Sequence, residues 1–140
     1  MKLTYTLAFT LIGLFTCITV SGQTLTEKQK EREKNKVEIY TSDEKDNIQM
    51  WFYNKTNEMN LSKPVRDQYN QIITDNIFDM RRLNDKDKDY TQDEINIKFD
   101  KLVEKTNASA KPILTNEQYE MHLENFGKLM HEAKTKQNKE

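Results

Sequence analysis

The two histidines are the first residues to consider for chemistry, because imidazole can bind a metal or transfer a proton near neutral pH. His122 and His131 lie nine residues apart. In one helix this spacing is a rotation of about 900°, which points the two rings to opposite faces. They cannot share a metal on that helix, and we interpret each as a single surface histidine. A metal role would need ligands from elsewhere, such as a glutamate or a partner chain.

The acidic run Asp85-x-Asp87-x-Asp89 is similar to the beginning of a calcium-binding loop. An EF-hand loop requires glycine at its sixth position and a bidentate glutamate at its twelfth. Here those positions hold Tyr90 and Asn96. We therefore interpret the run as a solvated connection between two helices.

No other set of residues in the sequence has the spacing of a catalytic site. We find no Ser/His/Asp arrangement, glycine-rich phosphate loop or carboxylate pair in an apolar setting. The sequence thus predicts a protein that is not an enzyme, with no catalytic residue, no metal site and no cofactor.

Residues 1–22 have the layout of a secretory signal peptide. Lys2 gives a positive start, an apolar run follows from Leu3 to Val20, and small residues end the segment. A retained membrane anchor is the alternative, since about 18 apolar residues can just span a bilayer. Lipidation of Cys17 is disfavoured because the apolar run continues past it. We expect export to the periplasm, a mature chain that starts at Gln23, and no stable membrane insertion after cleavage.

Composition predicts an all-α fold that holds no disulfide after export. The chain contains one cysteine, three glycines and two prolines, whereas sheets need glycine-rich turns and alternating patterns. The net charge of −1 gives no electrostatic reason to bind nucleic acid or an anionic membrane. We expect a charged arm over 23–42, either a frayed helix or mobile, a helical domain over 43–135 and a polar tail over 136–140.

A short motif predicts where the helices begin. In Leu114-Thr115-x-x-Gln118-Tyr119, Thr115 is an N-cap, Gln118 completes a capping box, and Leu114 and Tyr119 form a hydrophobic staple. The whole pattern or a part of it recurs at Leu25-Thr26-x-x-Gln29, Tyr90-Thr91-x-x-Glu94-Ile95 and Leu61-Ser62.

Two of the predicted helix starts, at Ser62 and at Ser42, have weaker patterns. After Leu61-Ser62, Pro64 falls in the first turn, where its missing donor is tolerated, and Val65 replaces the reciprocal glutamine. Ser42 is followed by acidic residues that suit the positive end of a helix.

Apolar residues at a 3.6-residue period predict four amphipathic helices over 43–57, 63–84, 92–110 and 116–134. Asn76 falls inside the apolar stripe of the second helix, where a buried amide would need partners. The predicted stripes are Ile48, Trp51, Phe52 and Lys55; Val65, Tyr69, Ile72, Ile73, Met80 and Leu83, with Ile77 at the edge; Ile95, Phe99, Leu102, Val103 and Ala110; and Tyr119, Leu123, Phe126, Met130 and Ala133.

Three apolar residues fall opposite these stripes: Phe78, Ile97 and Met121. Scattered apolar residues are normal on a protein surface and need no explanation. The alternative is a second, weakly apolar face, made cationic by Arg81 and Arg82 beside Phe78. These five residues are our candidates for a surface that binds other chains.

The order and spacing of these elements resemble the Spy/CpxP-like periplasmic proteins, which carry repeated Leu-Thr-x-x-Gln motifs. The resemblance covers about 50–134 and rests on four segments: Met50-Trp51-Phe52 before Leu61-Ser62, the long helix from Tyr69 to Leu83, the apolar residues Phe99, Leu102 and Val103 that follow it, and Ile113 to Gln118 before Phe126. The first motif departs from the pattern at Pro64 and Val65.

The resemblance implies a thin, curved, antiparallel homodimer of helical hairpins. It also implies an ATP-independent chaperone that holds unfolded or partly folded exported proteins, or a protein associated with envelope stress. The alternatives are a metal-responsive envelope protein and an exported helical interaction protein of unassigned role.

Overall fold

The computed structural model describes residues 25–139, and this part of the chain is all-helical. The predicted signal peptide, 1–22, lies outside the described residues. The elements are α1 (Glu27–Asn35), α2 (Ser42–Glu58), α3 (Lys63–Arg81), α4 (Gln92–Ala110), the 3-10 turn η1 (Lys111–Ile113) and α5 (Asn116–Gln137). The all-α prediction is confirmed. None of these helices is both long and apolar enough to cross a membrane.

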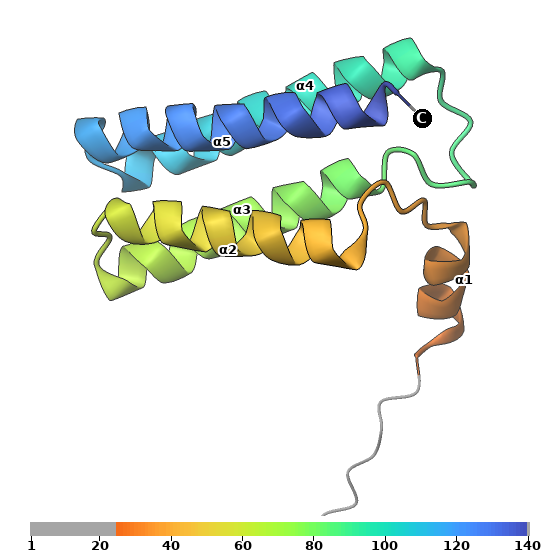
Figure 1. The fold of residues 1–140 in the computed structure, drawn as a ribbon, viewed down its shortest axis with the longest axis horizontal. Helices are drawn as coiled ribbons and strands as arrows, with labels where there is room; N and C mark the ends of the chain where they lie inside the picture. The colour runs from red at the N-terminus through yellow and green to blue at the C-terminus, as the bar shows by residue number, and fades with distance from the viewer. Residues whose placement is uncertain (1–24, 140) are drawn as a thin grey trace, which may run out of the picture.

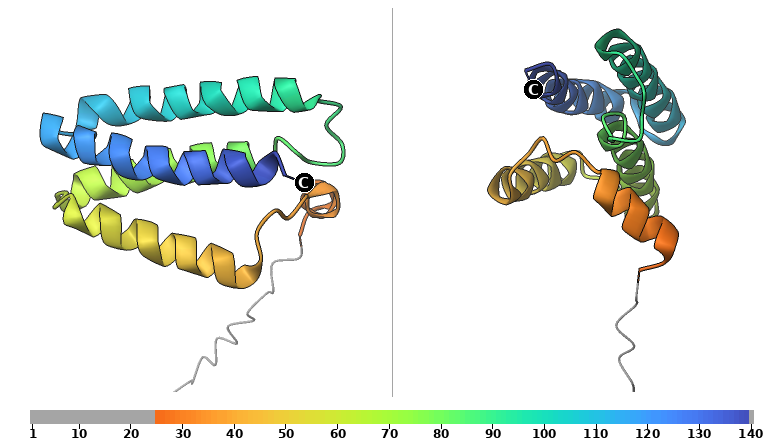
Figure 2. Two further views of the ribbon diagram at one scale, coloured as in Figure 1. Left: turned by 45° about the horizontal axis from the view of Figure 1, so that its top comes forward. Right: turned by 90° about the vertical axis from the view of Figure 1, so that its right-hand side faces the viewer.

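The four long helices α2, α3, α4 and α5 alternate in direction along the long axis of the molecule, while the short α1 lies to one side (Figure 1). Helix α4 packs against both α3 and α5. Seen end-on, α2 stands apart from α5, so that the two helices flank an open side of the molecule (Figure 2).

The predicted helix starts are confirmed wherever a full capping box was expected. The Thr115 hydroxyl accepts from the Gln118 amide at 3.2 Å, and the Gln118 side chain accepts from the Thr115 amide at 3.0 Å. Thr26 and Thr91 cap α1 and α4 in the same way. Ser62 begins α3 without any side-chain cap bond.

One helix start was placed a residue too late. The N-cap of α2 is Thr41, not Ser42, and its box is completed by Glu44. The pattern Thr-x-x-Glu was present in the sequence but was obscured by the neighbouring serine.

Two helix ends differ from the prediction. Helix α3 stops at Arg81, not at 84, whereas α5 continues to Gln137, past the predicted end at 134. Residues 136 and 137 of the predicted polar tail therefore belong to α5, and Gln137 is only 5% exposed. Within the predicted arm, the helical alternative is observed as α1, which contributes no buried residue.

The core lies between α3, α4 and α5 and is completed by the turn between α2 and α3. Its predicted members include Tyr69, Phe99 and Phe126. Leu123 was also predicted there, but it is 40% exposed. The sequence analysis missed three core residues, Met59, Leu61 and Leu129. Asn60, between the first two, takes the left-handed conformation that Asn tolerates in turns.

We predict that Thr115→Ala lowers the free energy of unfolding by about 1 kcal/mol, because it removes the oxygen that caps α5. Thr115→Ser should have little effect. Ser62→Ala is the matched control, because the Ser62 side chain makes no cap bond and its loss should cost almost nothing. Thermal and urea unfolding measure all three; equal losses for Thr115→Ala and Ser62→Ala would contradict the capping role.

Candidate functional site

His122 is fully buried, so its interpretation as a surface histidine was wrong. Its Nδ1 lies 2.9 Å from the Tyr69 hydroxyl, and its Nε2 lies 3.0 Å from Oδ1 of Asn107. A neutral ring that donates from Nε2 and accepts at Nδ1 satisfies both contacts. The imidazole also stacks on Phe126, with 5.2 Å between ring centroids. His122 therefore joins α3, α4 and α5.

Burial favours the neutral forms of His122 and Tyr69. It lowers the pKa of His122 to about 4 and raises the pKa of Tyr69. His131, in contrast, is exposed, as predicted. Among residues 25–139, no group of three or more His, Cys, Asp or Glu residues is placed to hold a metal ion.

The acidic run between α3 and α4 is only partly solvated. Asp85 is 4% exposed and pairs with Arg82, whose Nε lies 2.5 Å from Oδ2. Its desolvation raises the pKa of the Asp85 carboxyl, and Arg82 opposes that rise. Asp87 and Asp89 are exposed. The interpretation as a wholly solvated connection was therefore wrong for Asp85, which anchors the loop to the end of α3.

An apolar groove of about 750 Å³ is the candidate binding site. It lies between α2 on one side and α3 and α5 on the other, and Phe99 of α4 also lines it. Helix α2 contributes Ile48 and Phe52, α3 contributes Ile73 and Ile77, and α5 contributes Leu129 and Met130. We call this feature the groove.

Two large aromatic residues line the groove and remain largely open to solvent. Tyr53 of α2 is 60% exposed and Phe78 of α3 is 52% exposed. Neither is required to fill the core, so both are free to contact a bound chain. An apolar surface that stays exposed in this way is typical of a binding site.

Three residues that line the groove also carry buried polar atoms without hydrogen-bond partners. The Nε atom of Arg66 and the side-chain oxygens of Asn84 and Gln137 are buried and make no hydrogen bond within the described chain. Buried polar groups are normally paired, because an unpaired one is costly.

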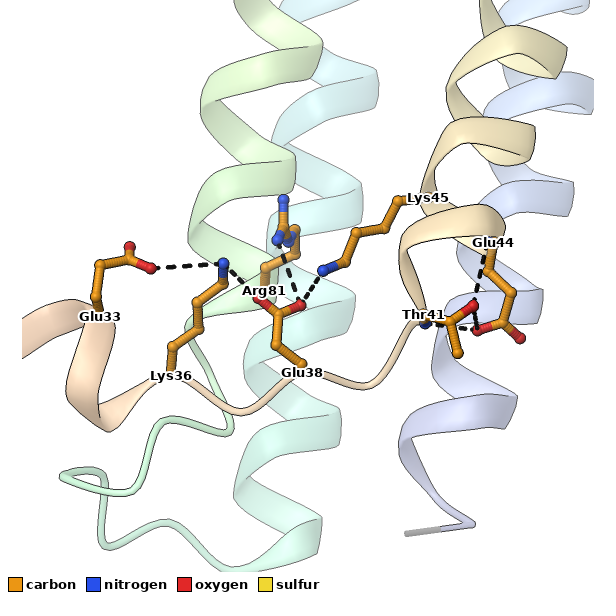
Figure 3. Close-up of polar contacts among 7 residues, drawn as sticks. All are labelled: Glu33, Lys36, Glu38, Thr41, Glu44, Lys45 and Arg81. Carbon is orange, nitrogen blue, oxygen red and sulfur yellow. Dashed lines mark hydrogen bonds and ion pairs between the residues drawn. The ribbon is translucent and has the colours of Figure 1, made fainter.

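The segment 36–40, which we call the strap, crosses one end of the groove between α1 and α2 (Figure 3). Val37, Ile39 and Tyr40 are half-buried and line the groove. The Glu38 carboxylate contacts Lys36, Lys45 and Arg81, the last at 3.9 Å from Nη2. Hydrogen bonds from Lys36 and Lys45 lower the pKa of Glu38 to about 2.

The structure brings together only two of the five residues predicted to bind other chains. Phe78 and Arg81 line the groove. Ile97 is exposed, as predicted, but does not line the groove. Met121 is half-buried against the core, so its predicted position opposite the buried stripe was wrong. Arg82 contacts Asp85 and the carbonyl of Arg32 instead.

The predicted helix-start residues have structural roles away from the groove. Leu61 is buried in the core, and Leu114 and Tyr119 are half-buried. Gln118 also donates to the Met59 carbonyl at 3.2 Å, which ties the start of α5 to the turn between α2 and α3. Tyr53 and the strap were missed by the sequence analysis, although the alternation Val37-Glu38-Ile39 is visible in the sequence.

No protein-family model, curated protein or solved structure matches this chain. The resemblance to the Spy/CpxP-like proteins therefore stays a prediction. Within the described residues, the geometry provides an apolar groove with polar atoms and cations along it and a buried, neutral histidine that fixes the helices beside it.

We predict that protonation of His122 makes stability depend on pH. Its pKa is about 4 when folded, against 6.5 ordinarily, so the unfolded chain binds the proton more readily. Protonation of this residue costs no stability well above pH 6.5, and the free energy of unfolding falls as the pH drops through 6.5 toward 4, by about 3 kcal/mol in total. Urea unfolding across this range should show the decline in the wild type.

The His122→Gln variant tests the origin of that decline, because its amide cannot titrate. We expect this variant to lose less stability than the wild type between pH 6.5 and 4. A decline of equal size in both proteins would assign it to other groups.

Proposed function

We propose that this chain is an exported, non-catalytic binding protein that holds unfolded or partly folded polypeptides in the groove. The observation that carries the proposal is the groove itself, a volume of about 750 Å³ that is lined by apolar residues of α2, α3 and α5 and left open. An unfolded chain exposes apolar side chains that such a surface can cover.

The contacts along the groove suit weak and reversible binding. Tyr53 and Phe78 offer apolar area that the fold does not need, and Lys45 and Arg81, which both contact Glu38 of the strap, lie on the same surface. Charge of this kind raises the rate of encounter, whereas small apolar contacts hold the bound segment. A holdase that works without a nucleotide needs this combination.

The Spy/CpxP-like resemblance supports the same function from an independent direction, through the order of the motifs. It also leads us to propose the finer architecture, a thin, curved arrangement of helical hairpins in a homodimer. The alternative of a metal-responsive envelope protein would be favoured if zinc or copper changed the oligomeric state. An exported interaction protein of unassigned role is the remaining alternative.

We predict that Tyr53→Ser combined with Phe78→Ser weakens the suppression of client aggregation severalfold, because both aromatic contacts to the client are lost. Helicity and melting temperature should change little, since both side chains are more than half exposed. Light scattering of a chemically denatured client, with and without the protein, measures the effect.

The matched control is Met50→Ser combined with Leu123→Ser. These residues are 62% and 40% exposed and lie on α2 and α5, but they do not line the groove. This control should protect the client as well as the wild type does. Equal protection by both double variants would show that the groove is not the binding site, and absence of protection by the wild type would refute the holdase function.

We also predict that the exported protein begins at Gln23 and forms a homodimer, in part through α3 and α4. Small helical domains bury a limited core, and they often gain further buried apolar area by associating with a second copy. Intact mass and sedimentation velocity of exported material at tens of micromolar test both statements. A species that retains residues 1–22 would contradict the cleavage, and a stable folded monomer would contradict the dimer.

A further inference from the structure

The strap places an extended piece of the chain itself against the groove. Residues 36–40 belong to no helix, and Val37, Glu38, Ile39 and Tyr40 all line the groove, the three apolar side chains half-buried and Glu38 more exposed. The strap therefore lies along the groove with one acidic residue between apolar neighbours. Its position shows one kind of segment that this end of the groove accommodates.

The charges at this end are arranged around one carboxylate. Lys45 comes from α2 and Arg81 from α3, so the two cations stand on opposite sides of the groove, and Glu38 contacts both (Figure 3). The low pKa of Glu38 keeps it ionised throughout the neutral range. An acidic side chain between apolar neighbours is thus the feature that the two cations recognise.

The strap is held by contacts that are easily exchanged. Its ion pairs involve side chains that are 23% to 46% exposed, and exposed pairs of this kind contribute little to stability. Lys136 lies 4.6 Å from the ring centroid of Tyr40, and the Lys86 amide donates to the Asn35 carbonyl at 2.8 Å just before the strap. The attachment of α1 to the rest of the chain therefore does not depend on residues 36–40.

Two orphaned acceptors lie at the same end of the groove. The side-chain oxygens of Asn84 and Gln137 are buried without partners, and both residues line a smaller cavity of about 270 Å³ together with Val37. The strap lies beside these two oxygens and makes no hydrogen bond to either of them.

From these contacts we propose that the strap is an internal occupant of the groove and that the groove selects extended client segments in which an acidic residue lies between apolar residues. This inference rests on the proposed function and adds to it the chemistry of the preferred client. A client of this kind replaces the strap by taking over its contacts to Lys45 and Arg81.

The test uses a fluorescein-labelled peptide with the sequence of residues 36–41, Lys-Val-Glu-Ile-Tyr-Thr, capped at both ends. Two further peptides carry Gln or Lys in place of the glutamate. Fluorescence polarisation with the whole mature chain should show the acidic peptide binding about fivefold more tightly than the Gln peptide, as expected for two partly exposed ion pairs. The Lys peptide should bind most weakly.

Variants of the protein separate the strap from the charge selection. Glu38→Gln removes the ion pairs of the strap with Lys45 and Arg81, so that the peptide no longer competes with them. The variant should therefore bind the acidic peptide about fivefold more tightly than the wild type does, the factor expected for two partly exposed ion pairs. The matched control is Glu33→Gln, because among residues 25–139 the Glu33 carboxylate pairs only with Lys36, at 3.7 Å, and Glu33 does not line the groove. Lys45→Glu combined with Arg81→Glu should invert the preference so that the Lys peptide binds best.

Equal binding of the three peptides would overturn the charge selection and leave the holdase function standing, because that function is tested by Tyr53 and Phe78 in the aggregation assay. Equal affinity of the Glu38→Gln and Glu33→Gln variants would overturn the role of the strap as an occupant. If no peptide bound to any variant while client aggregation was still suppressed, the whole inference would be wrong.

Discussion

One buried imidazole holds the helical framework in register. His122 of α5 has both ring nitrogens within hydrogen-bonding distance of partners, Tyr69 of α3 and Asn107 of α4. A buried polar group that loses its partner is costly. If any of these helices slid or rotated relative to the others, a ring nitrogen would lose its partner inside the core. The positions of α3, α4 and α5 are thereby fixed.

Helix α2 lies outside this framework, and the groove follows from that difference. At one end α2 is held by the core residues of the turn and by Phe52, which stacks on Tyr69 with 6.5 Å between centroids. At the other end its contacts include partly exposed ion pairs, such as Glu44 with Lys136. Apolar packing is the stronger of the two kinds of contact, so α2 closes on α3 at the turn and stands open at the strap.

The sequence predicted the features that depend on neighbours in the chain. Capping boxes join residues three positions apart, and those at Thr26, Thr91 and Thr115 were found as expected. The buried face of α5 was placed slightly out of phase, because apolar residues alone assigned Leu123 to the core. His122 could not be chosen over Leu123 without knowledge of Tyr69 and Asn107, which lie far from it in the sequence.

The groove was predictable only in part, because it too depends on contacts between residues that lie far apart in the sequence. Helical phase alone placed Phe78 and Arg81 away from the core stripe, and both line the groove. Tyr53 and the strap belong to the site because of where α2 docks, which no local pattern specifies. Since the cations on the two sides of the groove meet at a single carboxylate from the strap, the same docking decides both the shape of the groove and the charge that fits it.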